Sequence, residues 1–145
     1  IFGHVFFSDK LHFIDQEHKT FHLRALKAFL AETGVAIFDT GLRIRRTKNN
    51  ASDKDLEIVE QADIDGLLRQ LPQCKGVLAA GQLATQVFMQ HFGIKQMPKM
   101  GCFAEFTFEG RKLRLYRVPS SSRAYPMAVE KKAAFYQKMF DDVLR

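Results

Sequence analysis

Two short, uninterrupted apolar runs constrain the fold of this chain most: VAIF at residues 35–38 and GVLAA at residues 76–80. Uncharged runs of this length are typical of strands that are buried in a parallel sheet. Each run adjoins a helical pattern, over residues 17–32 before the first run and over residues 82–92 after the second. Helices that alternate with buried strands predict an α/β fold. We expect a three-layer αβα arrangement with a mainly parallel central sheet.

The rest of the chain predicts a few further elements. IFGHVFF at the start reads as the inside of a helix without a capping residue before it, so we expect further residues N-terminal to Ile1. A helix is predicted over residues 64–71 with Asp63 as its cap, and a hairpin over residues 103–118 that turns at Glu109 and Gly110. Pro126 is predicted to begin a closing helix. The buried stripe of that helix would be Val129, Ala133, Tyr136, Phe140 and Val143.

Length and composition set the class of protein. A chain of 145 residues is expected to form one domain, and no apolar run approaches the ~20 residues that span a bilayer. The chain starts with no signal-peptide pattern, and its two cysteines form no disulfide framework, so we expect a cytoplasmic protein. Its net charge of +6 favours a polyanionic partner, but only weakly, because many proteins are this basic.

A loop rich in serine, VPSSSRAYP, follows the last predicted strand. The hydroxyls and backbone amides of this loop can donate hydrogen bonds to phosphate oxygens. The residues that contribute them are Ser120, Ser121 and Ser122. Arg123 has the charge to neutralise a phosphate or enter a groove, and Tyr125 has a ring that stacks on a base. The alternative is a surface turn whose serines cap the last helix.

A second polar loop is predicted from Asp39 to Lys54, after the run VAIF. It carries two asparagines and Ser52, and its cations are Arg43, Arg45, Arg46, Lys48 and Lys54. Loops at the carboxyl ends of strands are where ligands bind in such sheets, although basic runs are often only solvated surface. Asp39 itself is expected either to orient a ligand donor or to cap a turn.

Other patterns point to no further chemistry. His18 and His22 have the spacing of two metal ligands on a helix, but no third ligand is evident, so no metal site is predicted. GVLAAGQLATQ lacks the glycine patterns of dinucleotide-binding and phosphate-binding loops, and no nucleophile elbow occurs. We expect no cofactor.

Four segments together resemble the uracil-DNA glycosylase superfamily, in its mismatch-specific and thymine-DNA glycosylase branch with the hypoxanthine-removing relatives. GVAIFDTGLRIRR resembles the strand and base-recognition loop of that family, and ASDKDL a short segment that helps hold DNA. GVLAAGQLATQVF is similar to the next strand, glycine and helix. VPSSSRAYP resembles the serine loop that pinches the DNA backbone.

The resemblance implies an αβα domain that flips a damaged base out of double-stranded DNA and hydrolyses its N-glycosidic bond. By position, Ser52, Ser120 and Ser122 would contact phosphates. Arg123 would fill the vacated stack, in competition with Tyr125, and Asp39 would read the flipped base. Many uracil-specific members have asparagine where Asp39 stands, and an ionised carboxylate only accepts hydrogen bonds, so hypoxanthine ranks equally with uracil.

The family's glycine- and proline-containing catalytic loop is not found in this sequence, and we expect it upstream of Ile1. Two other functions remain open: a DNA-binding homologue without catalysis, and an α/β domain that binds a nucleotide or a phosphorylated small ligand. The resemblance implies a monomer that acts on DNA, and the short apolar runs of the sequence predict no contact with a membrane.

Overall fold

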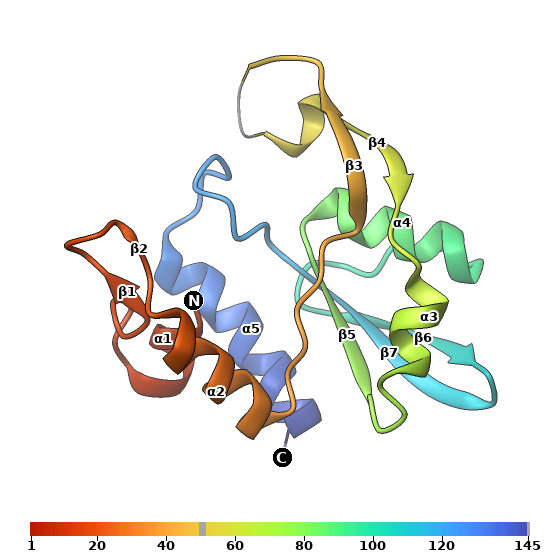
Figure 1. The fold of residues 1–145 in the computed structure, drawn as a ribbon. Helices are drawn as coiled ribbons and strands as arrows, with labels where there is room; N and C mark the ends of the chain where they lie inside the picture. The colour runs from red at the N-terminus through yellow and green to blue at the C-terminus, as the bar shows by residue number, and fades with distance from the viewer. Residues whose placement is uncertain (50–51, 145) are drawn as a thin grey trace. The chain divides into compact units, whose positions relative to one another are not determined.

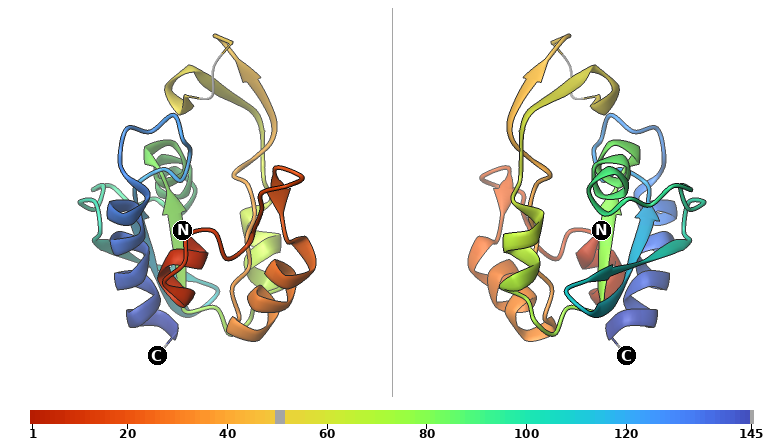
Figure 2. Two further views of the ribbon diagram at one scale, coloured as in Figure 1. Left: turned by 90° about the vertical axis from the view of Figure 1, so that its left-hand side faces the viewer. Right: turned by 90° about the vertical axis from the view of Figure 1, so that its right-hand side faces the viewer.

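The computed structural model describes residues 1–49 and 52–144. Contacts between residues group the chain into two compact units, shown in Figures 1 and 2. Unit 1 combines the two ends of the chain, Ile1–Phe38 and Met127–Arg145, and unit 2 is the continuous segment Asp39–Pro126. The organisation as a single domain stays a prediction. No helix in the described part of the chain is long and apolar enough to cross a membrane.

Unit 1 consists of three helices and a very short hairpin. The elements are α1 (Phe2–Phe7), β1 (Ile14–Asp15), β2 (Thr20–Phe21), α2 (Leu23–Thr33) and α5 (Val129–Leu144). The predicted helix at the start of the chain is confirmed as α1, and no side-chain hydrogen bond caps it.

Phenylalanine rings form the core of unit 1. The centre of the buried Phe29 ring lies 4.8 Å from that of Phe6 and 5.2 Å from that of Phe13. Phe140 of α5 extends the cluster, with ring centres 5.2 Å from Phe6 and 5.8 Å from Phe2. Tilted and edge-on ring pairs at these separations are favourable beyond the area that they bury. Aromatic packing therefore joins α1 and α2 to α5.

Two predictions for unit 1 are wrong. The helix predicted over residues 17–32 begins only at Leu23, because the preceding residues form the β1–β2 hairpin, in which Ile14 pairs with Phe21. The His22 backbone N–H donates to the Phe13 carbonyl, 2.8 Å away, and this bond holds the hairpin closed. The run VAIF is not a strand: residues 35–38 pair with no described strand, and Ile37 and Phe38 are more than half exposed.

The closing helix α5 is confirmed, but it begins at Val129 rather than at Pro126. The chain still bends at Met127, and the first helical hydrogen bond runs from the Lys132 N–H to the Ala128 carbonyl. Within the predicted stripe, three side chains are buried and Val129 and Val143 are half-buried. The buried members are Ala133, Tyr136 and Phe140.

Unit 2 contains a three-stranded sheet, two helices and a long hairpin. Its elements are β3 (Gly41–Arg46), η1 (Asp53–Asp55), β4 (Leu56–Gln61), α3 (Ile64–Arg69), β5 (Gly76–Ala80), α4 (Gln82–Phe92), β6 (Phe103–Phe108) and β7 (Arg111–Val118). The strand order of the sheet is β5-β7-β6, with β5 parallel and β6 antiparallel to the central strand. The predicted turn at Glu109 and Gly110 is confirmed, and both residues have positive φ, as a type I′ hairpin turn requires.

Both helices of unit 2 cover the same face of this sheet. Leu113 and Leu115 of β7 are almost fully buried in a cluster with Phe106 of β6, Leu68 of α3 and Val87 of α4. The predicted cap of α3 is confirmed, since the Gly66 N–H donates to Asp63 Oδ1 over 3.0 Å. The fold is therefore mixed α/β with one parallel strand pair. A three-layer αβα arrangement is not confirmed.

The polar loop predicted over residues 39–54 is instead half of a projecting hairpin, β3–β4, which stands out from unit 2 in Figures 1 and 2. Ile44 pairs with Ile58 and Arg45 with Glu57, and register shifts lie on either side of Arg43. Ile58 packs on the core of unit 2 and anchors the hairpin. Asn50 and Ala51, which fall within the predicted polar loop, lie outside the described residues.

Candidate nucleic-acid interface

The parallel pair β5–β7 brings two loops to one edge of the sheet. Ala80 and Val118, the last residues of the two strands, are register partners, and the Gly81 N–H donates to the Val118 carbonyl over 2.9 Å. The turn into α4 and the serine loop therefore begin side by side. We call this the carboxyl edge of the sheet, and in Figure 1 the two loops leave the sheet at the same end.

The first contribution to the carboxyl edge is the amino end of α4. Gly81 precedes the helix with φ of 99° and ψ of 165°, a backbone conformation that favours glycine, and no side chain caps the helix. The fully buried Thr85 fixes this turn by donating from Oγ1 to the Gly81 carbonyl, 2.8 Å away. The first amides of a helix have no intrahelical acceptor and lie at the positive end of its dipole. This edge therefore suits an anionic group.

The second contribution is the serine loop, whose conformation is fixed by hydrogen bonds of its own serines. Ser120 is buried and its Oγ accepts the Ser122 N–H over 3.2 Å. The Ser122 Oγ accepts the Ala124 N–H over 3.2 Å, and its carbonyl accepts the Tyr125 N–H over 3.1 Å. The alternative prediction is that these serines cap the last helix. The hydrogen bonds described here instead join residues within the loop.

The same folding decides which side chains the loop presents. Ser121 and Arg123 are exposed, while Tyr125 is half-buried. Arg123 has no ion pair among the residues that the structure describes. The loop ends at Pro126, and α5 begins three residues later.

Asp39 and Ser52 both belong to the hairpin region but lie apart. Asp39 is exposed at the base of the hairpin, next to Thr40, whose carbonyl accepts the Ala62 N–H over 2.9 Å. Ser52 is half-buried beside the turn η1 at the tip. The six residues of β3 that separate the base from the tip span about 20 Å. The structure therefore does not gather these two predicted residues into one small pocket.

The cations of the hairpin are largely paired with its own carboxylates. Arg43 lies 3.8 Å from Glu60, and Lys48 lies 3.8 Å from Asp55. Arg45 donates to Glu57 from both Nε and Nη2. Such exposed pairs add little stability, but they offset part of the positive charge of the arginine run.

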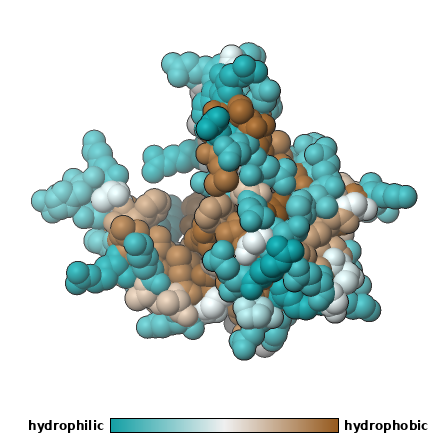
Figure 3. Space-filling view, turned by 45° about the vertical axis from the view of Figure 1, so that its right-hand side comes forward, coloured by the Kyte–Doolittle hydropathy of each residue, from teal (hydrophilic) through white to brown (hydrophobic). Residues whose placement is uncertain are grey.

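The strands of the hairpin also expose aliphatic side chains, the hydrophobic band below the hydrophilic tip in Figure 3. The exposed members are Leu42, Ile44 and Val59. The sequence carries an indication of this hairpin, because apolar residues alternate with arginines in LRIR, but no hairpin turn residues accompany it.

A third segment at the carboxyl edge could not be predicted from the sequence. The turn 98–102 enters β6, and the Gly101 N–H donates to the Arg117 carbonyl over 2.7 Å. Nothing in KQMPKMGC marks a ligand loop. Only the antiparallel pairing of β6 with β7 shows that this turn reaches the edge where β7 ends.

The two histidines considered as metal ligands are not on a helix. His18 Nδ1 lies 2.7 Å from Asp15 Oδ2 within the β1–β2 turn, and this hydrogen bond lowers the pKa of the Asp15 carboxyl. Within residues 1–49 and 52–144, no group of three or more His, Cys, Asp or Glu side chains is placed to hold a metal ion.

Nearly all of the net positive charge belongs to unit 2. By sequence, unit 2 has fourteen Lys and Arg against nine Asp and Glu, whereas unit 1 has eight against seven. Comparison of the chain with protein-family models, with curated proteins and with solved structures found no match. The resemblance to the uracil-DNA glycosylase superfamily therefore rests on the residues of this chain, above all on the serine loop.

Proposed function

We propose that the protein is a DNA repair glycosylase, which flips uracil or a related deaminated base out of double-stranded DNA and hydrolyses the N-glycosidic bond. Hypoxanthine and mismatched thymine are the related bases. One observation carries the proposal: the serine loop stands at the carboxyl edge beside the uncapped amino end of α4. The resemblance of this loop to the DNA-pinching loop of the uracil-DNA glycosylase superfamily suggests the reaction, hydrolysis of an N-glycosidic bond.

The carboxyl edge suits a DNA backbone chemically. Phosphate oxygens accept hydrogen bonds from backbone amides and hydroxyls, and such contacts fix the position of a protein on DNA without reading the sequence. Flipping a base costs a few kcal/mol, and less for a mispaired base. An exposed cation such as Arg123 would recover part of this free energy by filling the space that the base leaves.

Asp39 is our candidate for contact with the flipped base. Its carboxylate is exposed and forms no ion pair within the described part of the chain. An ionised carboxylate accepts hydrogen bonds only, so it suits a ring N–H, which both uracil and hypoxanthine offer. Such a hydrogen bond would hold the base in position for cleavage of its glycosidic bond. We assign the activation of water to no residue of 1–145.

The test is base release from defined duplexes. Each duplex carries one uracil opposite guanine or adenine, one hypoxanthine opposite thymine, or one thymine opposite guanine, and abasic sites are detected by alkaline cleavage. We expect release of uracil or hypoxanthine and no cleavage of the undamaged duplex. A protein that binds these duplexes and releases no base from any of them would overturn the proposal.

That negative result would leave the second candidate, a DNA-binding homologue without catalysis. The charge of unit 2 favours it independently of Asp39, because phosphate contacts need cations but no reacting group. Failure to bind any DNA at low salt would contradict both candidates and would favour a domain for a small phosphorylated ligand.

A further inference from the structure

The turn 98–102 is held rigidly beside the end of β7. Arg117 provides three hydrogen bonds: its carbonyl accepts the Gly101 N–H, its N–H donates to the Cys102 carbonyl over 3.0 Å, and its guanidinium donates to the Pro98 carbonyl over 3.2 Å. The Cys102 N–H closes the turn by donating to the Lys99 carbonyl over 2.9 Å. A turn fixed at this many points holds its side chains where the serine loop begins, two residues after Arg117.

Lys99 is the cation that this turn presents. Its side chain is exposed, and it forms no ion pair among the residues that the structure describes. It thus differs from the cations of the hairpin β3–β4, three of which face carboxylates. An unpaired ammonium group binds a phosphate without first losing another partner, and each such contact releases counterions from DNA.

We infer that Lys99 is a further DNA-phosphate contact, and that the DNA covers the turn 98–102 together with the serine loop. The inference rests on the proposed function, because it names a second strip of the same interface. It also predicts which edge of the sheet faces the DNA. The DNA contacts the carboxyl edge and leaves the opposite edge, where β5 begins, in solvent.

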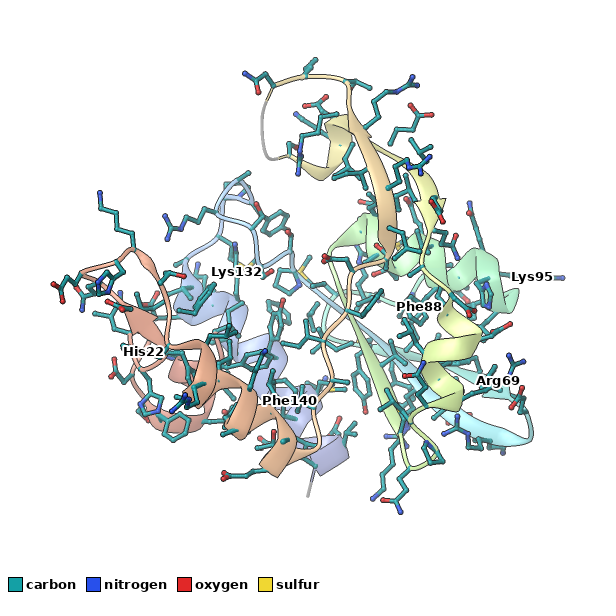
Figure 4. All side chains as sticks on the ribbon, viewed as in Figure 1. His22, Arg69, Phe88, Lys95, Lys132 and Phe140 are labelled. Carbon is teal, nitrogen blue, oxygen red and sulfur yellow. The ribbon has the colours of Figure 1, made fainter. Side chains whose placement is uncertain are left out.

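The chain contains a matched control for Lys99 in the same loop. Lys95 is also exposed, but it lies just past the carboxyl end of α4, where Figure 4 shows it pointing away from the molecule. The eleven residues of α4 carry the chain about 16 Å from the amino end of that helix. Lys99→Ala and Lys95→Ala remove the same charge from the two ends of this loop.

The two cysteines lie at opposite edges of the sheet and can therefore report which edge the DNA covers. Cys102 is exposed at the carboxyl edge, whereas Cys74 is half-buried before β5, at the opposite edge. Burial raises the pKa of the Cys74 thiol, so it reacts more slowly, but its rate serves as an internal reference. Each alkylation rate is measured by mass spectrometry with and without a duplex that carries 2′-fluorinated deoxyuridine, whose glycosidic bond resists hydrolysis.

We expect the duplex to slow alkylation of Cys102 severalfold and to leave Cys74 unchanged. Lys99→Ala should weaken duplex binding at every sequence and reduce the salt slope by about one, while Lys95→Ala changes neither. DNA binding by the wild type with no protection of Cys102, or with equal effects of the two variants, would overturn this inference alone. Absence of DNA binding by the wild type would instead overturn the proposed function. Circular dichroism of both variants confirms that they are folded.

Discussion

At the scale of single residues, the structure separates two candidates for the side chain that fills the space left by a flipped base. Arg123 is exposed at the outside of the serine loop, whereas Tyr125 is half-buried and its backbone N–H is used within the loop. A side chain that enters a base stack must extend away from its own protein. Arg123 is therefore the better candidate, although the sequence alone left the two equal.

We predict that Arg123→Ala weakens binding of a duplex with a damaged base more than binding of an undamaged one. Loss of one base-stacking contact is worth ~1–3 kcal/mol, so affinity for the damaged duplex should fall about fivefold to 150-fold. Fluorescence anisotropy with both duplexes measures the difference. Tyr125→Ala is the comparison, and a larger loss in that variant would assign the role to Tyr125.

Some residue-level features follow from the sequence because they depend on near neighbours. Asp63 caps α3 as predicted, since its acceptor reaches an amide only three residues away. The roles of Ser120 and Ser122 in folding their own loop were not predicted, because serines that bind phosphate and serines that fold a turn have the same sequence. The sequence does not place Lys99 at the carboxyl edge, because its position depends on the pairing of two strands.

At the scale of elements, the sequence predicted well wherever one element follows another directly. The strand, glycine and helix from Gly76 to Phe92 and the hairpin from Phe103 to Val118 are confirmed. Prediction failed where pairing decides: VAIF has the composition of a strand but no partner among the described strands, and LRIR becomes a strand through its pairing with β4. Residues 17–22 have a helical pattern, yet they belong to the β1–β2 hairpin and its connection to α2.

The phenylalanine core of unit 1 gives a prediction about stability at this scale. Phe29→Ala leaves a cavity among the rings of Phe2, Phe6 and Phe13 and should lower the free energy of unfolding by ~3–5 kcal/mol. The matched control is Phe21→Ala, at a side chain that is 58% exposed, and it should change stability by no more than about 0.5 kcal/mol. Urea unfolding followed by circular dichroism compares the two variants. Equal losses would contradict the assigned core.

At the scale of the whole molecule, the asymmetry of charge predicts how DNA binding depends on salt. Unit 2 has an excess of five positive charges, but its hairpin cations are mostly paired, so we expect only three or four phosphate contacts. Affinity should then fall about fortyfold to 150-fold between 50 and 200 mM salt. Titrations across this range measure the slope. A flat response would contradict the electrostatic part of the interface.

In the proposed reaction, Asp39 contacts a base that the carboxyl edge holds out of the duplex. The most direct test is single-turnover base release from a duplex with one uracil or one hypoxanthine, comparing the wild type with Asp39→Ala and Asp39→Asn. We predict that Asp39→Ala slows release by about a hundredfold or more while binding of undamaged duplex is unchanged. Asparagine keeps an acceptor for the ring N–H, so Asp39→Asn should retain part of the activity. Base release by Asp39→Ala at the wild-type rate would contradict the role given to Asp39.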